Sequence, residues 1–426
     1  MSRDLAMNLR VLFDISVLGA AHAHPHSRTG VFRYVDRLAR FLIQQPDLDL
    51  SWTPYGNPDH TWDVLDALQC DPSLQRPITA SLMKRRCVDF VAGPVQYLAS
   101  THAYPLVRPL IEPCKRMQQT ATFSQRNLKN ADIIHSPFHS FPKLDFSLPR
   151  PVRFLTVHDL IPLKFPELFD PAIAMTQRQT LDQLTKRDWI ICNSQNTRND
   201  LLQFCDTLHP DHAVVTPLAA AEHFARCTDT QQIEQVRKKL NIPLNAQYFL
   251  SVCTLEPRKN LRHLVTVFEQ ILNQLDKDTY LVLVGAKGWK IDSLIQYLAK
   301  SGNQNILTPG KVDEEDLAPL YSDAIAFVYP SLYEGFGLPP LEAMQCGTPV
   351  ICSDNSSLPE VVGDAGILID AEQPDDLGDA MTRVYADHDL RRSLSAAGLE
   401  RAQRFSWQQC GQMTVNAYQR AIESIE

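Results

Sequence analysis

The chain has 426 residues, of which 44% are hydrophobic and 21% charged, a composition typical of a globular protein with two domains. Its formal net charge of −8 comes almost wholly from the second half, and neither half has the basic surplus that nucleic-acid binding requires. Ten cysteines without a Cys-x-x-Cys pair argue against a disulfide framework and a zinc site. With no signal-peptide core and no apolar run of roughly 20 residues, we expect a cytoplasmic protein whose membrane contact, if any, is peripheral.

The first half begins with short apolar runs that predict a parallel sheet. Residues 9–18 predict a buried strand, and residues 31–45 predict an amphipathic helix because apolar side chains recur there at helical spacing. Three later β-branched runs are expected to be strands whose ends deliver a polar side chain to a loop. These side chains are His135, His158 and Ser194.

A proline-rich stretch, residues 54–171, is expected to be irregular, with long loops. Within the first half, the only local basic runs are residues 84–86 and residues 115–116. Each run is typical of a solvated helix face. Contact with an anionic membrane or a lipid-phosphate acceptor is the alternative.

Strand and helix alternate more clearly in the second half, which follows a linker near residues 225–241. The expected strands are residues 248–255, 280–286, 305–310, 324–331, 348–354 and 365–370. The expected helices are residues 261–275, 291–301, 313–324 and 337–347. This alternation predicts a doubly wound parallel sheet, in which ligands bind beyond the carboxyl ends of the strands.

The strongest chemical signal is the run SLYEGFGLPPLEAMQCGTPVICSD, in which Glu334 and Glu342 are eight residues apart. Gly335 and Gly337 leave backbone amides uncovered, and the two prolines that follow suit the first turn of a helix. Such a helix N-terminus favours an anion. The plainer alternative is a turn followed by an acid that stabilises the helix dipole.

Three other segments place charged residues, a histidine or a glycine at a strand end or a helix start. Arg258 and Lys259 follow an expected strand and could neutralise a diphosphate, or they could be an exposed loop pair. His158 stands at a strand end, where a core or capping role is the alternative. Gly30 precedes the first long helix and either lets the backbone approach a diphosphate or only begins the helix.

These motifs together resemble the retaining GT-B glycosyltransferases of glycosyltransferase family 4, the glycosyl transferases group 1. Glu334 and Glu342 are similar to the E-x7-E element of that family, and EPRKN, HDLIP and SRTGVFRYVDRL are similar to three further elements. The wording is closest to that of bacterial mannosyltransferases. The resemblance is dense from residue 131 onward and present at residues 8–42, but it does not extend to residues 43–130.

The resemblance implies an α/β fold of the GT-B type, with two Rossmann-like doubly wound domains facing a cleft. Residues 1–225 would form the acceptor-side domain, on which a C-terminal helix at 406–426 would pack back. Residues 226–405 would bind the nucleotide-sugar donor. One departure from the family is Cys253, which stands where glycine is common beside the phosphates.

The implied reaction is a retaining transfer of a hexose from a nucleotide diphosphate sugar to a glycan or lipid-linked acceptor, in cell-surface polysaccharide synthesis. GDP-mannose is the favoured donor and a UDP-hexose the next. The residues implied to be catalytic are His158, Glu334, Arg258 and Lys259. Those implied to bind the donor are Gly30, Arg258, Lys259, Val312, Glu334, Gly335, Phe336, Gly337, Leu338 and Glu342.

The resemblance implies a role for each of these residues. The cations Arg258 and Lys259 would stabilise the leaving diphosphate in place of a metal, so neither a metal nor another cofactor is expected. Glu342 would bind the ribose, Glu334 the sugar hydroxyls, and the backbone around Val312 the base. His158 would reach the sugar from the opposite domain.

Other interpretations remain open. A GT-B nucleotide-sugar epimerase would use the same donor without an acceptor, and a non-catalytic nucleotide-sugar-binding protein would keep only the fold. No Asp-x-Asp pair suited to a donor-site metal, no Gly-x-Ser-x-Gly and no P-loop is present. His22, His24 and His26 alternate as metal ligands on a strand would, but we favour a flexible loop on the acceptor side.

Overall fold

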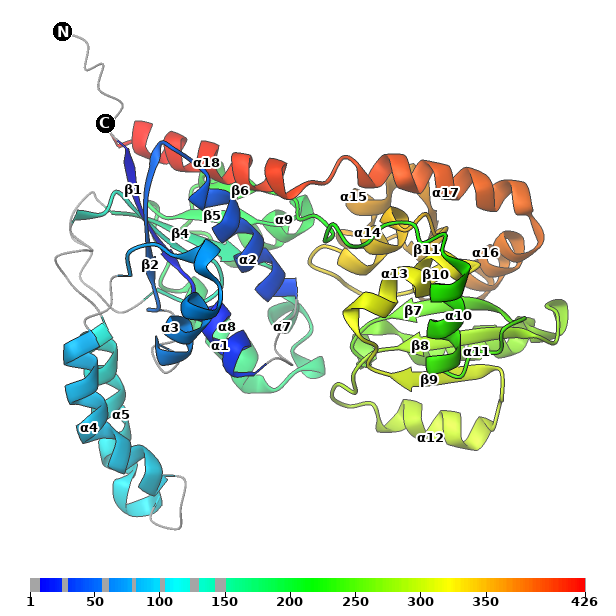
Figure 1. The fold of residues 1–426 in the computed structure, drawn as a ribbon, viewed down its shortest axis with the longest axis horizontal. Coiled ribbons are helices and arrows are strands. Elements are labelled where there is room, and N and C mark those ends of the chain that lie inside the picture. Colours follow the sequence, from blue (N-terminus) through cyan, green and yellow to red (C-terminus); the bar gives the residue numbers. More distant parts are fainter. Residues whose placement is uncertain are drawn as a thin grey trace, which may run out of the picture.

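The computed structural model describes residues 8–24, 30–55, 61–78, 82–99, 104–122, 130–141 and 151–425. The chain forms two units side by side, each built around a six-stranded sheet covered by helices (Figure 1). We call the unit around the sheet of residues 9–215 the N-terminal unit and that around residues 247–369 the C-terminal unit. All strand pairs within both sheets are parallel.

The N-terminal sheet has the order β2-β1-β3-β4-β5-β6. Its strands are β1 (Leu9–Asp14), β2 (Leu48–Thr53), β3 (Ile133–Ser136), β4 (Val152–Val157), β5 (Trp189–Cys192) and β6 (Ala213–Val215). Its longer helices are α1 (Ser16–Ala23), α2 (Gly30–Ile43), α3 (Thr61–Cys70), α4 (Leu82–Ala99), α5 (Tyr104–Thr122), α8 (Pro171–Leu181) and α9 (Gln195–Phe204), with the short α7 (Ile161–Lys164) after β4.

The C-terminal sheet has the order β12-β11-β10-β7-β8-β9. Its strands are β7 (Gln247–Val252), β8 (Thr279–Val284), β9 (Ile306–Gly310), β10 (Ala326–Tyr329), β11 (Val350–Ser353) and β12 (Ile367–Ile369). Its helices are α10 (Thr230–Lys239), α11 (Leu261–Ile271), α12 (Asp292–Ser301), α13 (Glu314–Asp323), α14 (Leu338–Gln345), α15 (Leu358–Val362), α16 (Pro374–Ala386) and α17 (His388–Ala402).

The strand order of the C-terminal sheet determines where a ligand can bind. Numbered within the unit, it is the doubly wound order 3-2-1-4-5-6, which reverses direction between β7 and β10. The loops that leave neighbouring strands at such a point diverge and open a crevice. Arg258 and Lys259 follow β7 and Glu334 follows β10, so the topology brings these two loops together.

A last helix, α18 (Trp407–Glu423), crosses from the C-terminal unit to the N-terminal one, where it packs on α2 (Figure 1). The indole N–H of Trp407 donates to the carbonyl of Ala220 over 3.2 Å, and Tyr418 is fully buried. Within the described ranges, no helix is both long enough and apolar enough to cross a membrane.

Three expectations about the first half are wrong. The run 9–18 is a strand only to Asp14, after which α1 begins and takes in His22, so this histidine lies in a helix rather than a loop. The residues that the structure describes between 54 and 171 are largely helical instead of irregular. Their helices α4 and α5 contain three internal prolines, all exposed, where water can satisfy the freed carbonyls. His26 lies outside the described residues.

His135 is the third wrong expectation, because it does not reach a loop. It lies inside β3 and is fully buried, with its ring nitrogens 2.5 Å from the Tyr418 hydroxyl and 2.8 Å from the Thr156 hydroxyl. Burial lowers the pKa of this imidazole to about 3, which keeps it neutral. His135 therefore ties α18 to the sheet and takes no part in the candidate site.

Candidate functional site

The centre of the site is an ionic cluster of Arg258, Lys259 and Glu334. Arg258 and Lys259 lie on a 3₁₀ turn, Pro257–Lys259, in the loop that follows β7. The Glu334 carboxylate is 2.6 Å from Arg258 Nη1 and 2.5 Å from Lys259 Nζ. Lys259 is only 7% exposed, so the alternative of an exposed loop pair is wrong.

Glu334 is held from several sides. The Ser331 hydroxyl donates to its Oε1 over 2.6 Å, and its backbone N–H donates to Ser356 Oγ over 2.9 Å. Burial by itself would raise the pKa of Glu334, but the charges of Arg258 and Lys259 outweigh it and lower this pKa to about 2. A permanently charged carboxylate therefore lies beside two cations.

We expect this cluster to make stability depend on pH. The folded-state pKa of Glu334 lies below its ordinary 4.5, so the stabilisation is present above about pH 4.5 and is lost as the pH falls toward 2. Urea denaturation across that pH range measures the free energy of unfolding. For Glu334→Gln this free energy should lack the decrease at low pH that Glu334 causes in the wild type. The variant should also be less stable at pH 7, because two buried cations lose their counter-charge. The exposed Glu400→Gln serves as control, and parallel pH profiles for wild type and Glu334→Gln would contradict the expectation.

The loop that carries Glu334 reaches across to the N-terminal unit. The Ser194 hydroxyl donates to the carbonyl of Gly335 over 2.7 Å, and the Tyr333 hydroxyl lies 2.8 Å from Lys164 Nζ and 2.6 Å from Asp200 Oδ2. A Cβ atom at Gly335 would come within 2.3 Å of the carbonyl oxygen of His158. Glycine is therefore required here by close approach of the two units.

His158 follows β4 and faces this loop, as expected for a residue at a strand end. Its Nε2 lies 2.9 Å from the carbonyl oxygen of Pro137, and because a carbonyl only accepts, Nε2 carries the proton. Burial lowers the pKa of His158 to about 4. The imidazole is thus neutral at pH 7, with Nδ1 as a hydrogen-bond acceptor.

Glu342 is the second acid of the pair and has different neighbours. It lies in α14, one turn after Gly337, whose φ of +123° is a conformation that side chains rarely adopt. Its carboxylate is 2.5 Å from Arg33 Nη1 and 3.2 Å from the Tyr321 hydroxyl. Burial raises the pKa of Glu342, and Arg33 opposes that shift.

Two cavities flank these acids. The first, which we call the histidine cavity, has a volume of about 640 Å³ and contains His158, Asp159 and Arg258. Its other lining residues are Phe138, His139, Ser140, Leu155, Thr156, Val157, Leu160, Ile161, Pro162, Phe169, Ala172, Ile173, Thr176, Gln177, Thr180, Leu181 and Trp289. Two of its buried polar atoms, Arg258 Nε and Gln177 Oε1, have no hydrogen-bond partner in the described part of the chain, which is typical of a ligand site.

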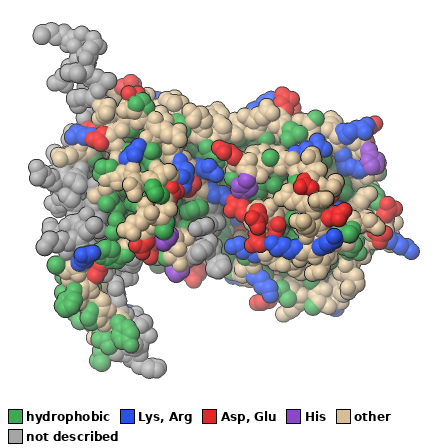
Figure 2. Space-filling view, in the orientation of Figure 1, with side chains coloured by type: hydrophobic (Ala, Val, Ile, Leu, Met, Phe, Trp, Pro, Cys, Tyr) green, Lys and Arg blue, Asp and Glu red, His purple; other side chains and the backbone are tan. Residues whose placement is uncertain are grey.

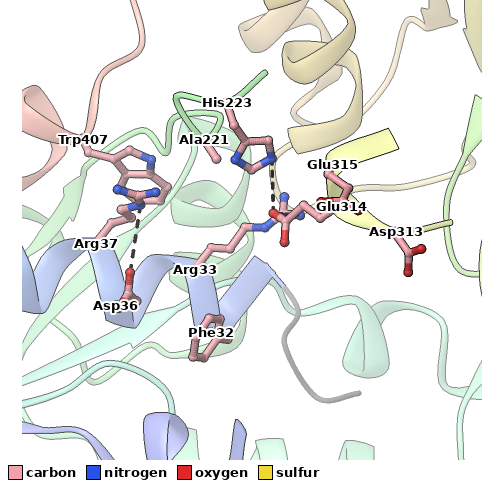
Figure 3. A pocket seen from close by; sticks show the side chains of 10 residues that line it. All are labelled: Phe32, Arg33, Asp36, Arg37, Ala221, His223, Asp313, Glu314, Glu315 and Trp407. Atoms are coloured by element: carbon pink, nitrogen blue, oxygen red, sulfur yellow. Dashed lines mark ion pairs between the residues drawn. The ribbon is translucent and has the colours of Figure 1, made fainter. Parts of the chain in front are cut away.

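The second, which we call the acidic cavity, has a volume of about 750 Å³ and lies between α2, α13 and the start of α18 (Figure 3). It is lined by Phe32, Arg33, Asp36, Arg37, Ala221, His223, Asp313, Glu314, Glu315 and Trp407. Arg33 joins it to Glu342, because its Nη2 also lies 3.0 Å from Glu314. Val312, the residue expected near the base, is buried directly before the three acids that line this cavity.

The remaining expected residues lie at the junction of the units. A Cβ atom at Gly30, the first residue of α2, would be 3.2 Å from Leu338 at the start of α14. Phe336 is 6% exposed and packs edge-on against Phe405. The structure thus places the expected residues around the junction between the two units. His158, Arg258, Lys259 and Glu334 lie together there, close to the histidine cavity described above.

Arg33 was missed by the sequence reasoning. It lies in the first turn of α2, where the helix dipole disfavours a cation. That position could have indicated an anionic partner outside the helix.

The sequence of this chain is similar to those of known glycosyltransferases. The family model described as "Glycosyl transferases group 1" matches residues 232–401. O-antigen chain mannosyltransferase B of Escherichia coli is 35% identical over 267 residues, which cover 62% of this chain and 69% of that protein. Serotype-specific mannosyltransferase WbdA of Escherichia coli is 28% identical over 275 residues, which cover 63% of this chain and 33% of that protein. This chain thus matches about a third of the length of WbdA.

A solved structure matches nearly the whole chain. Sucrose-phosphate synthase from Thermosynechococcus elongatus superposes with a TM-score of 0.63 over 98% of this chain and 100% of that one, at 21% sequence identity. At this identity the likeness concerns the fold alone. With the two parallel sheets, it confirms the expected GT-B fold.

Proposed function

The chain belongs to the glycosyl transferases group 1, and from that premise we propose that it transfers mannose from GDP-mannose to a growing surface polysaccharide, with retention of the anomeric configuration. The observation that carries this proposal is the buried Arg258–Lys259–Glu334 cluster beside the histidine cavity. The name of the mannosyltransferase that is 35% identical supports mannose and an O-antigen-type acceptor.

The cluster supports a diphosphate leaving group. Arg258 and Lys259 are fixed by Glu334 before any ligand arrives, so they need little reorganisation to stabilise the charge that develops on the departing phosphate. Arg258 Nε is a buried donor still without a partner among the described residues, and an anionic oxygen would satisfy it. We propose that these cations act in place of a metal.

The surroundings of Glu342 support a purine nucleotide. Glu342 would accept the ribose hydroxyls, and the backbone at Lys311 and Val312 would contact the base. The acidic cavity that follows offers carboxylates at α13, of which Glu315 forms no ion pair in the described structure. Guanine presents an N1–H and an amino group to such acceptors, whereas uracil presents one N–H. This difference favours GDP over UDP.

The histidine cavity would hold the transferred sugar and the acceptor. Neutral His158 can accept a hydrogen bond from a sugar hydroxyl through Nδ1, and Gln177 Oε1 is a second acceptor. Among the described residues that line this cavity, Asp159 is the one carboxylate, and it already accepts the backbone N–H of Ile161. We therefore propose that the acceptor oxygen bonds to the anomeric carbon on the face from which the phosphate leaves, and that the acceptor proton passes to that phosphate.

A thermal-shift panel tests the donor. GDP and GDP-mannose should raise the melting temperature more than UDP, ADP, TDP and their sugars, and the shift should persist in the presence of EDTA. A ligand at about 100 times its dissociation constant adds roughly 2.7 kcal/mol of stability. A larger shift with UDP would reassign the donor to a UDP-hexose. The absence of any shift would contradict the donor site and favour a non-catalytic protein.

The proposed setting is the cytoplasm, with peripheral contact at the inner membrane face, where a lipid-linked glycan would be presented. Nucleotide sugars are charged and require a hydrated site, whereas the lipid of such an acceptor remains in the bilayer. An enzyme that joins the two substrates would therefore work at the membrane surface.

A further inference from the structure

Helices α4 and α5 form a hairpin that projects from the N-terminal unit, away from both sheets (Figure 1). The two helices pack on each other, with Ala92, Val107 and Cys114 buried between them. The contact to the rest of the unit includes Trp62 of α3, whose indole N–H donates to Asp89 over 2.9 Å. No expected site residue lies on this hairpin.

Many of the exposed side chains described on the hairpin are large and apolar. Phe90 is 86% exposed, Val91 55%, Leu106 82% and Leu110 51%. The hairpin also carries the exposed side chains of Tyr97, Leu98 and Met117. Figure 2 shows hydrophobic side chains gathered over the projecting helices. Half of the 14 large hydrophobic residues that are exposed in the described structure therefore lie on these two helices, which is far more than a solvated helix pair needs.

The basic residues of the hairpin lie mostly toward the other end from its exposed apolar residues. Between residues 82 and 122 the sequence has six basic and two acidic residues, in a chain of net charge −8. Five of the six lie in the basic runs 84–86 and 115–116, far from Ala99 and Tyr104, where α4 ends and α5 begins. At a rise of about 1.5 Å per residue, these runs lie roughly 17–23 Å from those two helix ends, and Phe90, Leu106 and Leu110 lie within about 14 Å of them. Arg108 is the basic residue nearer the tip, where a long side chain can extend back to the headgroups.

We infer that the α4–α5 hairpin docks on an anionic lipid bilayer, with its apolar tip in the interfacial region and its basic runs at the headgroups. An apolar tip followed by basic residues has the depth profile of such an interface, and apolar burial and attraction to anionic lipid act together. A protein partner would require complementary acidic and apolar groups, for which nothing in the fold argues. The inference rests on the proposed function only for the lipid-linked nature of the acceptor.

Flotation of the full chain with lipid vesicles tests this inference. The wild type should float with vesicles of phosphatidylcholine and phosphatidylglycerol, and much less with phosphatidylcholine alone. The double variant Phe90→Ser, Leu106→Ser should reduce the bound fraction about tenfold or more, because most of the inserted apolar surface is lost. Leu244→Ser, Ile295→Ser is the matched control, since these residues are 48% and 40% exposed but lie on the other unit.

A charge variant separates the two contributions. Replacing Lys84 and Arg85 by Gln should weaken binding about fivefold per charge removed and reduce its salt dependence. Flotation of the Phe90→Ser, Leu106→Ser variant like the wild type would overturn the inference, as would equal wild-type binding to neutral vesicles. Lipid-free self-association that this variant abolishes would also overturn it and assign the tip to a second copy of the chain.

Activity on a soluble glycan acceptor distinguishes this inference from the proposed function. The Phe90→Ser, Leu106→Ser variant should transfer sugar to such an acceptor at the wild-type rate, because the hairpin is remote from the ionic cluster. Loss of vesicle binding with normal transfer supports the docking surface. Vesicle binding by a wild-type protein that shows no transfer would contradict the proposed function alone.

Discussion

Lys259→Ala should lower the rate of sugar transfer about 100-fold, because a charge-assisted hydrogen bond to a buried phosphate contributes about 2–3 kcal/mol or more. Lys259 Nζ lies 2.7 Å from the Tyr329 hydroxyl and 2.5 Å from Glu334, so the ammonium is held in place before the donor arrives. Its loss would be felt mainly in turnover, since charge on the phosphate grows as the bond to the sugar breaks. Steady-state kinetics with saturating donor measure the effect.

The control for this experiment is Lys238→Ala, whose side chain is 64% exposed on α10. It should leave turnover unchanged. Lys259→Arg should recover part of the activity, because it restores the positive charge with altered geometry. The melting temperature shows whether Lys259→Ala remains folded, since Arg258 still neutralises Glu334. Near-normal turnover in folded Lys259→Ala would remove the leaving-group role.

Glu342→Ala should weaken binding of the nucleoside diphosphate about tenfold or more, since hydrogen bonds to a charged group contribute about 1.5–3 kcal/mol. The Glu342 carboxylate forms an ion pair with Arg33, 2.5 Å away. Ribose hydroxyls would therefore compete with Arg33 for this carboxylate. Isothermal titration calorimetry with GDP measures the affinity directly.

Arg33→Met separates the two explanations for Glu342. If Glu342 binds the ribose, removal of the competing guanidinium should preserve or strengthen GDP binding. If Glu342 serves only to hold Arg33, neither Glu342→Ala nor Arg33→Met should alter GDP affinity. An unaltered affinity in Glu342→Ala would contradict the ribose role.

Much of the C-terminal unit could be predicted from sequence because its local signals agree with one another. Strands β7 to β12 are short β-branched runs bounded by turn residues, and each lies inside its expected range or begins one residue before it. Their order could not be derived in this way. The contact of Lys259 with Glu334 joins residues 75 positions apart and depends on the pairing of β7 with β10.

The errors have physical causes too. Pro94, Pro109 and Pro113 indicated irregular structure, yet each lies on an exposed helix face, where the lost hydrogen bond can be replaced by water. His135 follows a β-branched run just as His158 does. One is inside its strand and the other one residue beyond it, and that difference is smaller than the accuracy with which a strand end can be predicted from sequence.

The contacts of Tyr333 and Gly335 with the N-terminal unit have a consequence for the catalytic cycle. These residues are the immediate neighbours of Glu334. The segment that positions the Glu334 carboxylate therefore also forms hydrogen bonds between the two units. Under the proposed function, release of a spent nucleotide would require these contacts to open. These hydrogen bonds would then break and form again in every round of synthesis. The rate of chain elongation would depend on how quickly Tyr333 loses its contacts with Lys164 and Asp200.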